Sequence, residues 1–316
     1  MKPFRKNVAI AIDGGGIRGV IVTQALSLLE QHLGRSVCDI FRLAAGTSTG
    51  SIISAGIAAG LTAERMHQLY LGLGSRIFKK TLRSKLWPLT RFRYPHTALS
   101  DALQLYIGDI KMGDFWSSIP PTDVVITTFD MITNKTCFIK PWKPDYKDWP
   151  VIRAILASSS VPTYFPVVEG RYVDGGVGSY ANPCYLAAYE AQFCLKWDPK
   201  ETTLISLGTG RDPHPMKPGQ PGRFMVWDWL VPTLDAFLAS ADDQQVHLVE
   251  TFFKDLDFRR FQVDLKKAIP MDDPRQIPNL VKYGKLMGQM MLNDQVDEAM
   301  GIKPLRMIHA TSDPKG

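Results

Sequence analysis

The sequence predicts an α/β protein with a mostly parallel sheet covered by helices. The first observation is an apolar stretch at 7–12, followed by a glycine turn and by apolar residues at helical spacing over 20–33. The second is a short apolar stretch at 42–45, which leads through a Gly/Ser turn into the small helix formers of 52–60. The third is that strand-like and helix-like segments continue to alternate beyond residue 200.

The later elements follow from the same lengths and periodicities. A third helix is expected from Thr62. No internal repeat, low-complexity tract or long linker divides the chain, so we expect one domain over 1–316, with its motifs within 7–211 and a segment 212–316 that completes or decorates it. We expect further strands at 124–128, 136–139, 171–173, 203–207 and 261–265, and further helices near Val151, Pro183 and Asn279.

The composition limits the location of the protein. Charged residues or prolines interrupt every apolar run before the roughly 18 residues that a membrane-spanning helix needs. The basic start 1–6 and the apolar run 8–12 resemble a signal peptide, but Asp13 ends that run too early for an apolar region of about 7 to 15 residues. We therefore expect a cytoplasmic protein, with peripheral membrane contact as the remaining option. The cysteines lack zinc-site spacing, so we expect no metal and four reduced thiols: Cys38, Cys137, Cys184 and Cys194.

The charge points to anionic partners. The net charge is +6 and the isoelectric point is near 9.0, which suits phospholipid surfaces or nucleic acid. The segment 76–96 carries seven basic residues and no acid, interleaved with Phe78, Trp87, Tyr94 and other apolar residues. Basic charge with aromatic anchors is typical of segments that bind an anionic bilayer, and an ordinary solvated loop is an equally good interpretation. Nucleic acid is unlikely, since no recognition motif accompanies the charge.

The stretch Gly46-Thr47-Ser48-Thr49-Gly50 matches GxSxG at the point where a strand ends and a helix begins. Glycines on both sides permit a tight, strained turn that projects the serine above the sheet, at a helix N-terminus that favours negative charge. An ordinary Gly/Ser turn is the alternative, because short GxSxG strings occur by chance. In this context we interpret Ser48 as a nucleophile, with Gly46 and Gly50 supporting its turn.

A serine nucleophile needs a base within hydrogen-bond reach. None of the six histidines has a glycine-flanked or strand-end setting that suggests catalysis: His32, His67, His96, His214, His247 and His309. Asp174 follows a strand-like segment and precedes Gly175 and Gly176, which let another backbone approach its carboxylate. Asp-Gly-Gly alone usually indicates a turn. Together with Ser48, it predicts that Asp174 is the base.

A third motif, Asp13-Gly14-Gly15-Gly16-Ile17-Arg18-Gly19, follows the first strand. Consecutive glycines expose backbone N–H groups at a helix start, where they can bind an oxyanion or a phosphate. The string also fits the dinucleotide fingerprint G-x-G-x-x-G, with Asp39 about twenty residues further on. The serine motif after the next strand favours the oxyanion interpretation.

These motifs, in this order, resemble the patatin-like phospholipase family: DGGGIRG, GTSTG, ASSSVPTYFP at 157–166, and VDGG followed by Asn182-Pro183. The resemblance implies a three-layer α/β/α fold and a Ser–Asp dyad without histidine or cofactor. It makes Ser48 the nucleophile and Asp174 the base of an acyl hydrolase acting on phospholipid, lysophospholipid or other carboxylic esters. It also implies that Gly14, Gly15 and Gly16 line the oxyanion hole, with Arg18 supporting their loop or meeting an anionic headgroup.

The resemblance fades after Arg211, and the Pro- and Trp-rich segment 214–229 has no assigned role. Two other functions stay open. One is a conventional α/β-hydrolase esterase whose histidine is one of the six. The other is a catalytically silent module that binds lipid or nucleotide.

Overall fold

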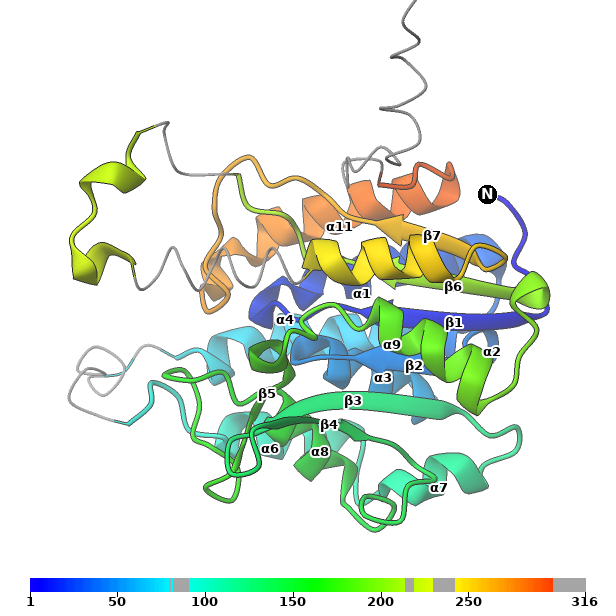
Figure 1. Cartoon of the computed structure of the whole chain (residues 1–316), viewed down its shortest axis with the longest axis horizontal. Coiled ribbons are helices and arrows are strands. Elements are labelled where there is room, and N and C mark those ends of the chain that lie inside the picture. Colours follow the sequence, from blue (N-terminus) through cyan, green and yellow to red (C-terminus); the bar gives the residue numbers. More distant parts are fainter. Residues whose placement is uncertain (80, 82–90, 214–218, 230–241, 298–316) are drawn as a thin grey trace, which may run out of the picture.

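A computed structural model describes residues 1–79, 81, 91–213, 219–229 and 242–297 (Figure 1). Its strands are β1 (Asn7–Ile12), β2 (Leu43–Gly46), β3 (Asp123–Asp130), β4 (Lys135–Ile139), β5 (Tyr172–Asp174), β6 (Thr202–Leu207) and β7 (Asp257–Phe261). Its principal helices are α1 (Gly19–Leu33), α2 (Val37–Ile40), α3 (Thr49–Ala58), α4 (Ala63–Ile77), α6 (Thr97–Tyr106), α7 (Met112–Ser117), α8 (Val151–Ser158), α9 (Cys184–Tyr189) and α11 (Ile277–Leu292), with a further helical segment at 242–252.

The strands form a seven-stranded sheet in the order β4-β3-β2-β1-β6-β7, with β5 paired to β3. The strands from β3 to β7 in this order pair in parallel, whereas β4 and β5 each pair antiparallel to β3. In parallel strands the carboxyl ends meet at one edge. The loops after β1, β2 and β6 therefore converge at that edge.

Helices cover both faces of the sheet, which confirms the predicted three-layer fold. Alternate residues of a strand point to opposite faces. Ile10 and Ile12 of β1 enter the core formed with α1, α3, α4 and α11, while Ala9 and Ala11 enter the core formed with α9 and the segment 242–252. Figure 1 shows α9 in front of the sheet, with α1 and α3 behind it.

One predicted strand is wrong in its position. We expected it at 261–265, but β7 covers Asp257–Phe261 and pairs with β6 from Thr203↔Asp257 to Leu207↔Phe261. The charged residues Arg259 and Arg260 interrupt the apolar pattern, yet both are buried in β7 because carboxylates neutralise them. An apolar pattern cannot predict a strand whose core-facing positions are ion-paired.

The described part of 212–297 adds to the same sheet and its cover. β7 extends the sheet, and α11 packs along α1. Glycine permits this close packing: a Cβ on Gly284 would lie 2.7 Å from the carbonyl oxygen of Ile21, and one on Gly288 would lie 2.6 Å from Leu28. No helix within the described ranges combines the length and apolar character needed to cross a bilayer.

Candidate active site

The predicted elbow is present, and Ser48 sits at its bend with φ 55° and ψ −122°. Such backbone angles are rare for any residue other than glycine and indicate local strain. Gly46 and Gly50 make the bend possible. A Cβ on Gly46 would overlap the backbone of Gly50, and a Cβ on Gly50 would overlap the carbonyl of Ile12.

Serines from two helices hold the elbow. The Ser48 N–H donates to Ser158 Oγ over 2.9 Å, and Ser51 Oγ donates to the Ser48 carbonyl over 2.6 Å. Ser158 belongs to the ASSS string at 157–160, and the next-but-one residue, Ser160, accepts the Asp174 N–H through its carbonyl over 3.0 Å. This string thus supports both candidate catalytic residues. The sequence shows the string but not this role, because its partners lie far away along the chain.

β2 and β5 meet end to end along one edge of β3. β2 pairs with the start of β3 as far as Gly46↔Ile126, and β5 enters from the other direction and pairs as far as Thr128↔Asp174. The opposite edge of β3 is occupied by β4. The carboxyl ends of two strands running in opposite directions therefore face each other, which brings the elbow and Asp174 together although 126 positions separate Ser48 from Asp174 in the sequence.

Thr127 lies between these two strand ends on β3. Its Oγ1 is 2.6 Å from Thr47 Oγ1, and Thr47 Oγ1 also donates to the Tyr180 carbonyl over 2.5 Å. On the other side, a Cβ on Gly175 would overlap Thr127. This contact explains the glycine after Asp174, since the chain must pass directly over Thr127.

The Asp174 carboxyl is buried and only partly hydrogen-bonded. Its Oδ1 accepts the Gly176 N–H over 2.8 Å, and its Oδ2 has no hydrogen bond of ordinary geometry in the described part of the chain. Burial raises the pKa of Asp174 to about 6, while the Gly176 N–H and the neighbouring Ser48 hydroxyl oppose that rise. A carboxylate with this pKa suits a general base that works near neutral pH.

The glycine loop lies against Ser48. A Cβ on Gly14 would be 3.3 Å from the Ser48 Cβ. The Gly14 N–H already donates to the Ala181 carbonyl over 2.9 Å. In the ranges that the structure describes, the N–H groups of Gly15, Gly16 and Thr49 have no hydrogen-bond partner. Thr49 was not among the predicted site residues, although the residue after an elbow nucleophile is a usual oxyanion donor.

Hydrogen bonds with residues that follow β6 in the sequence hold the glycine loop in place. Thr209 Oγ1 donates to the Gly14 carbonyl over 2.5 Å, and the Ile17 N–H donates to the Met271 carbonyl over 2.9 Å. Arg18 donates to the Gly210 carbonyl over 3.2 Å and to Asp212 over 2.6 Å. Of the two roles expected for Arg18, these contacts favour support of the loop over binding of a headgroup.

None of the four described histidines contacts Ser48 through a hydrogen bond, and two of them bond elsewhere. His67 Nδ1 contacts Thr23 Oγ1 over 3.1 Å, and His96 Nε2 contacts Ser160 Oγ over 3.2 Å. Burial lowers the pKa of His96 to about 4, and its ring stacks on Phe165. His32 and His247 are exposed. No hydrogen bond joins any of these four to Ser48, whereas the candidates His214 and His309 lie outside the described residues.

The structure also argues against dinucleotide binding. The fingerprint needs an acid at the carboxyl end of β2, beside the glycine loop. Asp39 lies on α2, before β2 begins at Leu43, and so at the opposite edge of the sheet. Within the described ranges no cluster of His, Cys, Asp or Glu could hold a metal ion.

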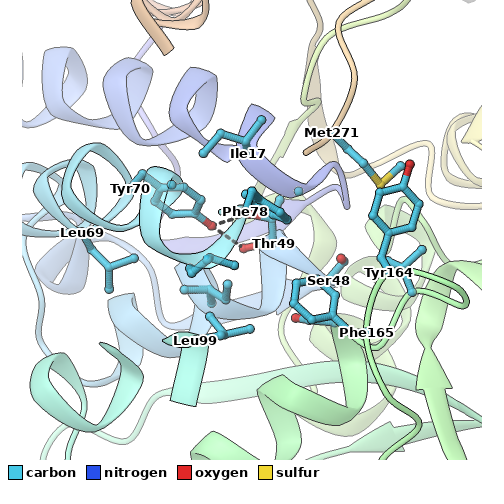
Figure 2. Close-up of a pocket in the computed structure, with 16 residues that line it drawn as sticks. Ile17, Ser48, Thr49, Leu69, Tyr70, Phe78, Leu99, Tyr164, Phe165 and Met271 are labelled. Carbon is cyan, nitrogen blue, oxygen red and sulfur yellow. Dashed lines mark hydrogen bonds between the residues drawn. The ribbon is translucent and has the colours of Figure 1, made fainter. Parts of the chain in front are cut away.

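A pocket leads away from Ser48 (Figure 2). Its walls come from the glycine loop, α3, α4, α6 and the segment 159–165. Apolar side chains dominate the lining: Ile17, Ile52, Leu69, Tyr70, Ile77, Phe78, Leu99, Val161, Tyr164, Phe165 and Met271. Pockets with such an apolar lining bind apolar groups of a ligand.

Two expected membrane anchors belong to the protein interior instead. Phe78 and Tyr94 are buried, and their rings pack edge-on with centroids 5.4 Å apart. Phe78 lines the pocket. Arg76 and Lys79 are exposed, while residues 80 and 82–90 of the basic segment lie outside the described residues.

The class of protein follows from this pocket. An apolar pocket that opens beside a serine elbow on an α/β sheet has the features that a lipid ester hydrolase needs. The family model for patatin-like phospholipase matches residues 10–188, more than half of the chain, and the chain belongs to that family.

Relatives agree with this assignment. The chain is 31% identical to the intracellular phospholipase A2 of Caenorhabditis elegans over 222 residues, which cover 65% of this chain but only 19% of that protein. It is 28% identical to Patatin-like protein 1 of Oryza sativa subsp. indica, over 82% of this chain and 75% of that one. The crystal structure of VipD from Legionella pneumophila aligns with a TM-score of 0.52 over 92% of this chain and 67% of VipD, at 11% identity, which shows a shared fold.

Proposed function

We propose that this protein is a serine acyl hydrolase that cleaves lipid esters with Ser48 as nucleophile and Asp174 as base. The observation that carries the proposal is the end-to-end meeting of β2 and β5, which brings the elbow serine and a buried carboxyl to the same point on β3. The pKa of about 6 leaves Asp174 largely ionised at neutral pH. It can then accept the hydroxyl proton.

The reaction proceeds in two halves. Asp174 takes the proton as Ser48 Oγ attacks the ester carbonyl, and the oxyanion accepts hydrogen bonds from the free N–H groups of Gly15, Gly16 and Thr49. The C–O bond to the alcohol then breaks, and the proton passes from Asp174 to the leaving oxygen. Water hydrolyses the acyl-serine in the same way, with Asp174 accepting its proton and returning it to Ser48.

The substrate is an ester with an apolar acyl chain, which the pocket beside Ser48 accommodates. A phospholipid, a lysophospholipid or another carboxylic ester would meet this requirement. The relatives named phospholipases support the first. We also propose peripheral contact with anionic bilayers through the exposed cations of 76–96, such as Arg76 and Lys79.

Two substitutions with matched controls test the dyad. Ser48→Ala and Asp174→Asn are each expected to lower kcat on p-nitrophenyl esters and labelled phospholipid by at least about a hundredfold. Ser54 lies on the same helix, α3, and its buried hydroxyl has no hydrogen-bond partner among the described residues, so Ser54→Ala is one control. Asp123→Asn removes a buried carboxyl at the other end of β3. Both controls should remain active, and full activity of Asp174→Asn would exclude the dyad.

A histidine-dependent esterase gives a different pattern. In that case His214→Ala or His309→Ala would abolish turnover, and Asp174→Asn would not. If Ser48→Ala leaves turnover unchanged, the activity does not come from this site.

A further inference from the structure

Tightly packed apolar side chains, with no room for a ligand or a water between them, lie behind the pocket that extends from Ser48. They include Ile53, Leu61, Met66 and Ile107. Three residues border both the pocket and this packed cluster: Ile52, Leu69 and Tyr70. We infer that this three-residue wall limits the length of acyl chain that the protein accepts, and that Leu69 is its specificity-determining residue.

The wall stands in the path of an acyl chain bound to Ser48. Ile52 lies in the first turn of α3, four positions after Ser48, and lines the same pocket. Leu69 and Tyr70 come from α4. In the view of Figure 2, Ser48 lies between Leu69 at one end and Tyr164 and Met271 at the other. A chain that enters past Tyr164 therefore reaches Leu69 last.

Tyr70 is the fixed part of the wall. Its hydroxyl bonds to Thr49 Oγ1 and donates to the Thr49 carbonyl over 3.1 Å. Its ring also fills the space where a side chain on Gly19 would be, 2.8 Å from the position of that Cβ. A ring held by polar contacts and by close packing cannot swing aside without breaking both.

Leu69 is the part that can be removed. It is 4% exposed, and its side chain has no polar group to satisfy. Truncation to alanine deletes side-chain atoms that line the pocket, and the neighbouring core relaxes only partly around such a deletion. The space left by the Leu69 side chain, with its apolar surroundings, then becomes available to the end of a longer chain.

The inference rests on the proposed acyl hydrolase function, and its test uses p-nitrophenyl esters graded from butanoate to octadecanoate. A methylene in an apolar pocket changes kcat/KM by about tenfold or more. Leu69→Ala is therefore expected to raise the ratio of long-ester to short-ester kcat/KM by at least about tenfold. Leu69→Phe should lower that ratio. Ile52→Ala opens the same wall from α3 and should act like Leu69→Ala.

Leu186→Ala is the matched control. Leu186 is also 4% exposed, but it packs on the opposite face of the sheet and does not line the pocket. It is expected to lose a similar amount of stability without any change in the ester profile, and thermal unfolding of each variant verifies that it is folded.

The results separate the two claims. If folded Leu69→Ala and Ile52→Ala keep the wild-type profile while they still cleave short esters, the wall has no role in chain length and only this inference is wrong. If the wild-type protein cleaves no ester of the series and no phospholipid, the proposed function is wrong and the inference falls with it.

Discussion

The guanidinium of Arg260 donates to both carboxylate oxygens of Asp13, over 2.8 and 2.5 Å, in the interior of the protein. Arg260 comes from β7, and Asp13 is the residue immediately before the glycine loop. Ser206 Oγ and the carboxylate of Asp242 accept further bonds from the same guanidinium. Strand β7, which lies outside the family-matched residues 10–188, thus holds the start of the glycine loop in place through this ion pair.

Removal of Arg260 alone should be costly. Burial raises the pKa of Asp13 to about 7 and Arg260 opposes that rise, so Arg260→Met leaves a buried acid without its cation. We expect the free energy of unfolding, measured with urea, to fall by about 3–5 kcal/mol. The double variant Asp13→Asn with Arg260→Met should recover part of that loss, because the buried carboxylate of Asp13 is then gone, although Asp242 still lacks its cation. Equal losses in the single and double variants would contradict this account.

The pH dependence of kcat/KM should show the ionisation of Asp174. Since the base must be ionised, kcat/KM on a soluble short ester is expected to rise with pH through about 6, where the buried carboxyl loses its proton. Initial rates across the acidic range at constant ionic strength measure this transition. The Asp123→Asn control should show the same transition. If kcat/KM instead falls only near the ordinary pKa of aspartate, burial does not raise the pKa of the base.

The backbone of Ser48 should reveal stored strain. Its φ of 55° and ψ of −122° suit glycine but not alanine. Ser48→Gly is therefore expected to be more stable than Ser48→Ala by roughly 1–3 kcal/mol, measured by denaturant unfolding, although both lack the nucleophile. At Ser54, inside α3, the order should reverse, because glycine is the poorer helix former there. Equal stabilities at position 48 would exclude strain at the elbow.

Asp123 should make the protein less stable as the pH rises. Burial and the adjacent Glu190 carboxyl raise its pKa well above 3.8, so the folded state holds a proton that the unfolded chain releases. This costs stability progressively as the pH increases above about 4. Asp123→Asn removes the ionisation, so its melting temperature should exceed that of the wild type at neutral pH and approach it near pH 4. A constant difference across this range would contradict the assignment.

Much of the fold and site could be predicted because the signals are local. The strand before Asp13 and the strand before Gly46 are short apolar runs followed by glycine, and such runs specify a buried parallel strand and its turn. Ser48 and Asp174 were predicted for a similar reason: Ser48 lies between two glycines after a strand, and Asp174 ends a strand and is followed by two glycines. The structure places them together, and their catalytic roles stay predictions.

The rest depends on contacts between distant segments. β7 was misplaced because Arg259 and Arg260 look exposed until their buried partners Asp257 and Asp13 are known. Thr127 looks like any strand residue until the ends of β2 and β5 are seen beside it. Phe78 looked like a membrane anchor within a basic segment, and only the packing of α4 shows it as a pocket wall.

The junction of β2 and β5 on β3 also has a mechanical consequence. Ile126 and Thr128, the partners of Gly46 and Asp174, are near neighbours on one continuous backbone. Bending or twisting of a sheet displaces distant strands relative to one another far more than it stretches a single strand. If a bilayer or a bulky substrate deforms this edge of the sheet, the spacing between the Ser48 hydroxyl and the Asp174 carboxyl should therefore remain nearly unchanged.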